Sequence, residues 1–308
     1  MRVGIFFHNR LPVRKYGGTQ RVIVWLARAL RELGHDPCII TRPGTRLPEF
    51  RTAEVPGRIA RDSRHDDGIL LDPWLPRGLD VIHFFNQVAA RTELPRLTTE
   101  EGNGYRGPVR PEHVFVSRDH MKRHGGLHFV YNGIDPADYE FRPDKEDFLL
   151  FLARVRWKVK GVDRAERIAK AADRRLVIAG GRRFHFDRRI RSVGEVDDER
   201  KAHWLARARA LLNPIRWDEP FGLNVTEALV SGCAVLASPL GSMPELVTPD
   251  VGFLCDSEEE FVDRIGDLDR IDPDACRARV LDRFTHIHMA EAYLRLYDRA
   301  IAGTLDAA

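Results

Sequence analysis

The chain has 308 residues, and because domains usually span about 100–200 residues, we expect two domains. Hydrophobic residues make up 43% and charged residues 31%, a balance that favours a soluble globular fold over long disorder. The 49 Lys+Arg nearly balance the 46 Asp+Glu, and the formal net charge of +3 argues against a general nucleic-acid binder.

Short apolar runs alternate with amphipathic stretches along most of the chain. Runs without in/out alternation are typical of strands buried on both faces of a parallel sheet. They predict strands at residues 3–7, 38–41, 81–85, 114–117, 129–131, 148–153, 176–179, 211–213 and 234–238. Helices are expected at residues 20–33, 163–172, 199–208, 224–231, from Asp272-Pro273 onward and at 290–301. This alternation predicts two doubly wound α/β units.

Two regions interrupt the pattern. Residues 135–147 contain prolines and several charges, and we place the domain boundary there. Residues 45–76 are rich in Arg, Asp and Pro, and the sequence assigns them little structure. Charged runs of mixed sign such as residues 197–201 are interpreted as solvated surface.

The strongest chemical signal is the segment from Trp217 to Ala228, which reads W-D-E-P-F-G-L-N-V-T-E-A. Pro220 and Gly222 predict a tight entry into a helix, with the N–H groups of residues 221–223 at its amino end. Such an end carries partial positive charge and favours a phosphate. Glu219 and Glu227 flank this entry. The alternative is that both glutamates are ordinary surface acids, and the surrounding motif disfavours it.

A second signal follows the strand expected at residues 148–153, where Arg154 and Lys160 stand in a basic run. Open parallel sheets bind ligands at the carboxyl ends of their strands, so two cations here suit a diphosphate. A third, weaker signal is Tyr16-Gly17-Gly18-Thr19 before the first helix, because paired glycines permit close backbone approach to a ligand. The alternative for the basic run is a solvated loop, and the alternative for the paired glycines is a simple turn.

Other features point away from metal, disulfide and secretion. The four cysteines are far apart and form no C-x-x-C, so reduced core residues are expected. His120, His124 and His128 are spaced by four, but Gly125-Gly126 would end the helix that aligns them. The amino-terminal residues show no signal-peptide pattern, and no apolar run approaches about 20 residues. We expect a cytoplasmic location, with attachment to a membrane surface left open.

Taken together, these segments resemble the retaining glycosyltransferases of the GT-B fold, glycosyltransferase family four. The likeness is most specific from Tyr131 to Phe253. The matching elements are Gly17-Gly18, Asn132-Gly133-Ile134-Asp135, Arg154 with Lys160-Gly161, the E-P-F-G-L…E-A segment, and the runs at 232–237 and 241–247.

The resemblance implies two Rossmann-like domains facing an interdomain cleft. Residues 1–140 would form the acceptor domain and 141–286 the nucleotide-sugar-binding domain. The final helix, about 287–308, would return to the first domain. The acceptor would be a glycan, a lipid or a small molecule, and no metal or other cofactor would be needed.

The resemblance also implies roles for individual residues. Arg154 and Lys160 would hold the donor diphosphate, and Glu219 would face the donor sugar beside the backbone of Phe221, Gly222 and Leu223. Glu227 would bind the ribose hydroxyls, and Val196 would lie beside the base. Gly17 and Gly18 would approach the donor from the other domain.

One position departs from the family pattern. Glu101 stands where family members often carry a histidine near the donor sugar, with His83 as a second candidate for that place. A carboxylate there would repel a uronic acid donor. The departure also leaves open a degenerate nucleotide-sugar-binding protein, against which the intact Arg154, Lys160, Glu219 and Glu227 argue. A GT-B nucleotide-sugar 2-epimerase shares the architecture and is a further alternative, although the E-P-F-G-L…E-A segment fits a transferase better.

Overall fold

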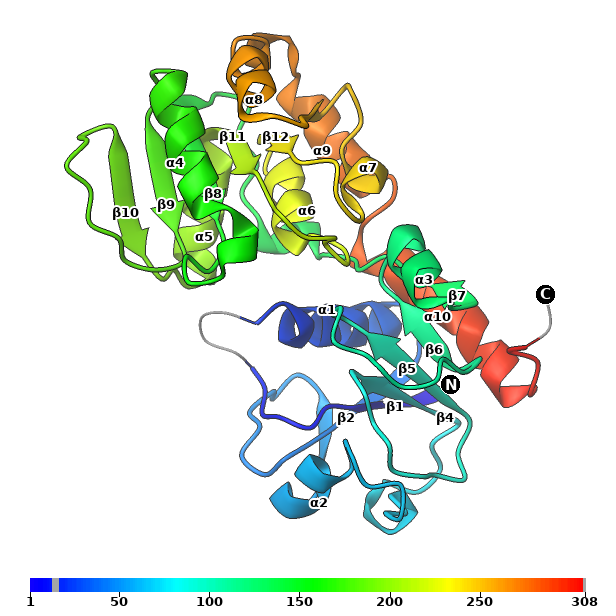
Figure 1. The fold of residues 1–308 in the computed structure, drawn as a ribbon. Helices are drawn as coiled ribbons and strands as arrows, with labels where there is room; N and C mark the ends of the chain where they lie inside the picture. Colours follow the sequence, from blue (N-terminus) through cyan, green and yellow to red (C-terminus); the bar gives the residue numbers. More distant parts are fainter. Residues whose placement is uncertain (13–16, 307–308) are drawn as a thin grey trace. The chain divides into compact units, whose positions relative to one another are not determined.

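The computed structural model describes residues 1–12 and 17–306, which divide into two compact units (Figure 1). Unit 1 contains the chain up to Gly133 together with the segment that starts at His286, and unit 2 contains Ile134–Thr285. The sequence places the same transitions at about residues 140 and 287. Each unit is an α/β fold around one parallel sheet, as expected.

Unit 1 is built on a seven-stranded sheet in the order β3-β2-β1-β4-β5-β6-β7, with every strand parallel to its neighbours. Its elements are β1 (Arg2–Phe6), α1 (Gly18–Glu32), β2 (Asp36–Thr41), β3 (Arg51–Glu54), α2 (Gly57–Asp62), a 3-10 turn (Asp72–Trp74), β4 (Val81–Phe85), β5 (Arg96–Glu100), β6 (His113–Phe115), α3 (Arg118–His124), β7 (His128–Phe129) and α10 (His286–Ile301). The order reverses between β1 and β4, as in doubly wound nucleotide-binding folds.

Unit 2 repeats this plan with the six-stranded order β10-β9-β8-β11-β12-β13. Its elements are a 3-10 turn (Pro136–Asp138), β8 (Glu146–Leu152), a 3-10 turn (Lys158–Lys160), α4 (Val162–Ala171), β9 (Leu176–Ala179), β10 (Ile190–Gly194), α5 (Asp198–Arg207), β11 (Ala208–Asn213), α6 (Leu223–Val230), β12 (Ala234–Ala237), α7 (Met243–Leu246), β13 (Gly252–Leu254), α8 (Glu258–Ile265), a 3-10 turn (Leu268–Arg270) and α9 (Pro273–Leu281). Here the order reverses between β8 and β11.

The apolar pattern explains the central elements. All five residues of β4 and all four of β9 are buried, which is why β9 is entirely apolar and β4 is apolar except for His83. On α1, the helical stripe that includes Val22, Trp25 and Leu26 is buried, and the helix packs beside α10 within unit 1 (Figure 1). The helix expected from Asp272-Pro273 onward is α9, and Asp272 caps it, because its side chain accepts a hydrogen bond from Asp274 N.

The region 45–76 contains more structure than its sequence indicates. It holds β3, α2 and a 3-10 turn. Because β3 is an edge strand whose residues are mostly exposed, its sequence R-T-A-E carries no apolar signal. Within the described residues, no helix combines the length and the apolar character needed to cross a bilayer.

Candidate functional site in unit 2

The predicted donor-site residues follow the two central strands of unit 2. Arg154 and Lys160 come after β8, and Glu219 comes after β11. These strands are neighbours at the point where the strand order reverses. The loops that leave two such strands diverge to opposite faces of the sheet, and ligands bind between them. The topology therefore supports the position expected from the sequence.

Lys160 and Glu219 form a buried ion pair. The 3-10 turn ends at Lys160, whose side-chain nitrogen bonds to Glu219 Oε2, and the two residues are only 7% and 8% exposed. The same oxygen accepts a hydrogen bond from Trp217 Nε1 at 2.9 Å. The Lys160 ammonium also lies 4.7 Å from the centroid of the Trp217 ring. The two predicted catalytic residues are thus brought together, and a ring shields their charges from water.

A second loop holds the segment that carries Glu219. Ser242 N donates to Glu219 O at 3.0 Å, and the Ser242 hydroxyl donates to Phe221 O. Gly241 has φ +62°, and a Cβ there would lie 2.3 Å from Glu219 N. The close approach of the two backbones therefore requires glycine at position 241. The sequence does not indicate this contact, because it joins two separate loops and the run at 241–247 carries only a family likeness.

The segment then enters α6 as the motif predicts. Phe221 is buried, and Gly222 adopts the left-handed conformation with φ +97° directly before Leu223, the first helical residue. Among the residues that the structure describes, no side chain caps α6 at this end. The amino end of an eight-residue helix therefore starts beside Glu219, where its partial positive charge favours an anion.

Arg154 is exposed and lies in the loop that follows β8. Its guanidinium stands 5.4 Å from the centroid of the Trp157 ring, a cation–π contact. The next residue, Val155, donates its N–H to Gly180 O at 3.2 Å, which fixes this loop against the end of β9. The rings beside Arg154 and Lys160 therefore belong to different tryptophans, Trp157 and Trp217. The shared role of the two cations at a diphosphate remains a prediction.

Glu227 belongs to a second buried cluster. It is 6% exposed, and its Oε1 accepts hydrogen bonds from Tyr139 OH at 2.7 Å and from Lys201 Nζ at 2.5 Å. Lys201 lies on α5 and is itself only 7% exposed, so the interpretation of residues 197–201 as solvated surface is wrong for this lysine. Val196 is half-buried just after β10. The structure records no direct contact between Glu227 and Glu219 within the described residues.

The predicted glycine loop lies in unit 1. Gly17 is buried, and Gly18 is the first residue of α1. Tyr16, which belongs to the same motif, lies outside the described residues. The approach of Gly17 and Gly18 to a donor stays a prediction.

The end of β5 carries a pair of buried carboxyl groups. Glu101 Oε2 accepts a hydrogen bond from Asn132 Nδ2 at 2.9 Å. Burial raises the pKa of both Glu100 and Glu101 to about 7, and for Glu100 the neighbouring Glu101 adds to the effect. In the described part of the chain, Oε1 of each carboxyl has no hydrogen-bond partner. Whether Glu101 faces a donor sugar remains a prediction.

His83 has a structural role in unit 1. It is fully buried, and its ring nitrogens bond to Tyr297 OH and to Thr99 Oγ1, both at 2.7 Å. Burial lowers its pKa to about 3, so the imidazole is neutral. With both nitrogens satisfied inside the core, His83 is not available as the sugar-facing histidine that the sequence offered as a second candidate.

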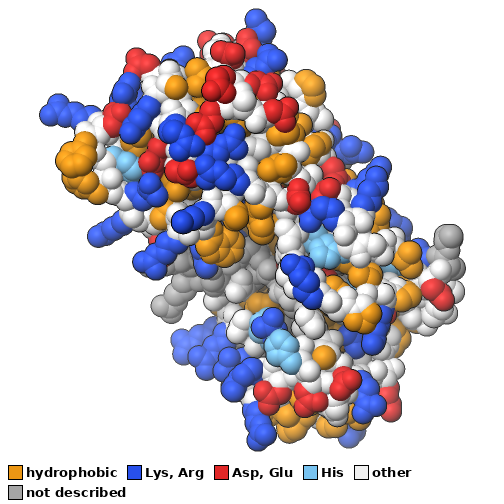
Figure 2. Space-filling model, viewed as in Figure 1, with side chains coloured by type: hydrophobic (Ala, Val, Ile, Leu, Met, Phe, Trp, Pro, Cys, Tyr) orange, Lys and Arg blue, Asp and Glu red, His pale blue; other side chains and the backbone are white. Residues whose placement is uncertain are grey.

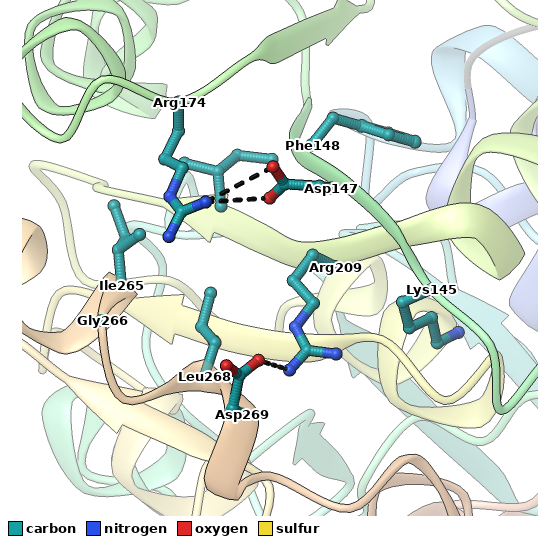
Figure 3. Close-up of a pocket in the computed structure, with 10 residues that line it drawn as sticks. Lys145, Asp147, Phe148, Arg174, Arg209, Ile265, Gly266, Leu268 and Asp269 are labelled. Atoms are coloured by element: carbon teal, nitrogen blue, oxygen red, sulfur yellow. Dashed lines mark hydrogen bonds and ion pairs between the residues drawn. The ribbon is translucent and has the colours of Figure 1, made fainter.

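A cavity lies at the opposite end of the unit 2 sheet from the predicted donor-site residues (Figure 3). This cavity of about 290 Å³ lies at the amino ends of β8 and β11. Arg174 bonds to Asp147 at 3.1 Å, Arg209 pairs with Asp269, and Lys145 donates to Ala206 O at 2.8 Å. Its cations are already paired, and none of the predicted site residues lines it.

Metal binding finds no support in the side chains that the structure describes. Across residues 1–12 and 17–306, no three His, Cys, Asp or Glu side chains gather as a metal site. The helix of His120 ends at His124 before the left-handed Gly125, as the sequence predicts. All four cysteines are buried and free. That the protein acts without a metal remains a prediction.

Comparison with known proteins gives consistent matches. Residues 146–269 match the family model described as glycosyl transferases group 1. Phosphatidyl-myo-inositol mannosyltransferase of Propionibacterium freudenreichii subsp. shermanii is 25% identical, over 82% of this chain and 81% of its own. The mannosyltransferase of Mycolicibacterium smegmatis is also 25% identical, over 78% of this chain and 76% of its own.

Solved structures extend the match to the whole chain. AviGT4, a glycosyltransferase involved in avilamycin A biosynthesis, aligns with a TM-score of 0.78 and 27% identity over 98% of both chains. Sucrose-phosphate synthase of Thermosynechococcus elongatus shares the fold, with a TM-score of 0.72 and 17% identity over 98% of this chain and 99% of its own. Anabaena HepE, solved with UDP-glucose, aligns with a TM-score of 0.65 and 14% identity over 100% of both chains. Residues 146–269 therefore carry a group 1 glycosyltransferase sequence, and the chain as a whole is a glycosyltransferase with the GT-B fold.

Proposed function

We propose that this protein is a retaining glycosyltransferase that moves a sugar from a nucleotide-sugar donor to an acceptor without a metal ion. The observation that carries the proposal is the buried Lys160–Glu219 pair where the strand order of unit 2 reverses. A cation and a carboxylate held beside a helix amino end suit a substrate that has a diphosphate next to a hydroxyl-rich sugar.

In this mechanism the bond between the anomeric carbon and the diphosphate oxygen breaks, and the diphosphate gains negative charge. Lys160, Arg154 and the amino end of α6 stabilise that charge more in the transition state than in the donor. Glu219 faces the sugar, which becomes positively charged as the bond breaks. Because its carboxylate already neutralises Lys160, the donor phosphate competes with Glu219 for the same ammonium group.

The acceptor oxygen then attacks the anomeric carbon from the face that the diphosphate leaves. The proton of the acceptor hydroxyl passes to a phosphate oxygen of the leaving group, so the products are the glycoside and a protonated nucleoside diphosphate. No covalent sugar–enzyme bond forms, and the anomeric configuration is retained. Glu227 and Val196 would serve the ribose and the base, with Lys201 and Tyr139 holding the Glu227 carboxylate in place.

The named relatives support the choice of substrates. HepE was solved with UDP-glucose, which favours a nucleotide-sugar donor for a chain of the same fold. The two mannosyltransferases act on phosphatidyl-myo-inositol by name, which keeps a lipid among the acceptors, together with glycans and small molecules.

The test is to incubate the protein with UDP-, GDP- and ADP-sugars, with and without EDTA, and to follow the nucleotide and the sugar separately. Slow release of nucleoside diphosphate and free sugar, unchanged by EDTA and lost in Glu219→Gln, supports the proposal. Asp269→Asn is the matched control, because this exposed carboxylate lies at the far end of the same sheet. Binding without turnover would favour a degenerate binding protein, and a 2-epimerised product would favour the epimerase. Each of these outcomes would overturn the proposal.

A further inference from the structure

The connection from β9 to β10 exposes two phenylalanine rings side by side. Phe184 is 81% exposed and Phe186 is 94% exposed, the highest values among the large hydrophobic side chains of the described residues. Their ring centroids are 4.9 Å apart and the planes are nearly perpendicular. We call residues 180–189 the β9–β10 loop; it runs outside β10, the edge strand of unit 2 (Figure 1). Two adjacent rings in water are costly unless a partner covers them.

Polar contacts hold this loop in place, so the exposure of the rings does not come from a lack of structure. Arg183 Nε lies 2.7 Å from Glu166 Oε1, on α4. His185, between the two phenylalanines, turns inward and lies 3.9 Å from the same oxygen. At the start of the loop, Gly181 O accepts a hydrogen bond from Ser192 Oγ at 2.8 Å. Since His185 points inward, the rings of its two neighbours point outward.

The loop is also strongly basic. It carries Arg182, Arg183, Arg188 and Arg189 against the single acid Asp187. Arg183 is paired with Glu166, and Arg189 lies 2.9 Å from Asp187. Arg182 and Arg188 are exposed, and neither has an ion-pair partner in the part of the chain that the structure describes. Figure 2 shows hydrophobic side chains beside a histidine at this end of unit 2, flanked by Lys and Arg side chains.

We propose that the β9–β10 loop is a membrane-binding surface, in which Phe184 and Phe186 enter the interface of a bilayer and Arg182 and Arg188 bind anionic lipid headgroups. Phenylalanine rings of peripheral proteins enter the boundary between headgroups and acyl chains, and basic side chains gain energy from an anionic surface. The proposal goes beyond the reaction, because binding to lipid requires neither a donor nor turnover.

A bilayer fits this surface better than a second protein copy does. A stable protein interface buries about 800 Å² on each partner, and two rings on one loop offer much less apolar surface. A bilayer interface needs no matching shape, and the unpaired arginines complement its negative charge. The near-neutral net charge of the chain also disfavours single-stranded nucleic acid, although arginines and aromatic rings would suit that ligand locally.

The experiment is co-sedimentation of the full chain with vesicles of phosphatidylcholine alone or of phosphatidylcholine with 30% phosphatidylglycerol. We expect binding to the anionic vesicles that weakens with added salt. Phe184→Ser/Phe186→Ser and Arg182→Gln/Arg188→Gln should each lower the partition coefficient about tenfold or more. Leu127→Ser is the matched control, because Leu127 is 57% exposed in unit 1, and it should bind like the wild type.

Several results would overturn the proposal. One is wild-type protein that stays in the supernatant with the anionic vesicles. Another is that both loop variants bind the vesicles as well as the wild type does, and a third is that Leu127→Ser loses as much binding as they do. Concentration-dependent dimers that disappear in the phenylalanine variant would assign the loop to a second copy. A stronger affinity for single-stranded DNA than for vesicles would assign it to nucleic acid. Loss of nucleotide-induced thermal stabilisation in the phenylalanine variant would place the loop in the donor site. Failure of the transferase assay alone would leave the vesicle result unaffected.

Discussion

At the residue scale, the main feature is a buried charge pair, and the catalytic role that we propose for it cannot be separated from its contribution to stability. Lys160 and Glu219 are almost excluded from water. Each charge can be buried only because the other one compensates it. Removing one partner of a buried pair leaves an uncompensated charge and typically costs about 3–5 kcal/mol. Replacing both partners by apolar groups often costs little.

This pair gives the first prediction. Glu219→Ala should lower kcat about 100-fold or more while the nucleotide still binds, and it should also lower the melting temperature. The double variant Lys160→Met/Glu219→Met should regain much of the lost stability but no activity. Calorimetry and a donor-hydrolysis assay separate the two effects. A Glu219→Ala protein with wild-type turnover would remove Glu219 from the catalytic site.

The second prediction concerns the carboxyl pair of unit 1. Burial raises the pKa of Glu101 from 4.5 to about 7 in the folded protein. The unfolded chain therefore releases this proton at lower pH, and the stability that the protonated carboxyl contributes falls as pH rises from about 4.5 to 7. The side chain in Glu101→Gln cannot ionise, so the free energy of unfolding should fall less steeply as pH rises. At pH 8 it should exceed that of the wild type by at most about 3 kcal/mol.

Urea unfolding between pH 4 and pH 8 measures this effect. Glu49→Gln serves as the control, because Glu49 is exposed in the same unit and should leave the pH dependence unchanged. If the free energy of unfolding changes with pH equally in the wild type and in Glu101→Gln, Glu101 is already ionised in the folded protein at pH 6.

At the element scale, the third prediction tests the contact between the loop that contains Gly241 and Ser242, called the Gly241 loop, and the segment before α6 that carries Glu219. Gly241→Ala should displace the Glu219 backbone, because its Cβ would lie 2.3 Å from Glu219 N and 2.4 Å from Glu219 O. We expect a loss of turnover greater than about tenfold, since small misplacements of catalytic groups are costly. Gly34→Ala is the control, because Gly34 has φ +81° and nothing within 4 Å of the added Cβ.

Both substitutions carry the strain of a positive φ, so the difference between them isolates the contact with Glu219. Turnover and nucleotide affinity should be measured for each variant. Two variants with the same activity would mean that the Gly241 loop does not set the position of Glu219.

Elements were predictable from the sequence where burial makes them apolar. The four residues of β9 are all apolar and all buried, and the strand was predicted with its observed limits. The strand β5 was not predicted, because Thr98, Thr99 and Glu100 are polar although they are buried. Edge strands such as β3 also carry no apolar signal, because solvent covers part of their surface.

The candidate site was predictable to a similar extent. A motif within one segment placed Glu219 at the entry to α6, and the strand end placed Lys160 near it. The partners of Glu227 were not predictable, because Tyr139 and Lys201 lie 88 and 26 positions away along the chain. The spacing of residues within one segment predicts the structure of that segment only. The cluster around Glu227 joins three distant segments and depends on how they pack together.

At the scale of the whole molecule, the last helix completes a unit that begins at the other end of the chain. Tyr293 and Tyr297 of α10 are fully buried in unit 1, where their hydroxyls bond to Thr99 Oγ1 at 2.8 Å and to His83 Nδ1 at 2.7 Å. His83 thus bonds to both β5 and α10, which links an early strand to the last helix.

This network gives the fourth prediction. Tyr297→Phe should leave His83 Nδ1 without its partner and lower the free energy of unfolding by about 1–3 kcal/mol. Chemical denaturation at pH 7.5 measures the change. Ile301→Ala on the same helix is the control, because Ile301 is 45% exposed and should change the stability much less. An unaltered Tyr297→Phe protein would show that the hydrogen bond to His83 contributes nothing net.

The return of α10 to unit 1 has a consequence for synthesis on the ribosome. Among the described residues, unit 2 is one continuous stretch, Ile134–Thr285, so this stretch is complete as soon as Thr285 has left the exit tunnel. Unit 1 starts earlier but lacks the helix that covers His83 until the segment from His286 has been translated. The half that is made first is therefore finished last, and until then the residues that α10 covers stay open to solvent, as is typical of partly folded domains during synthesis.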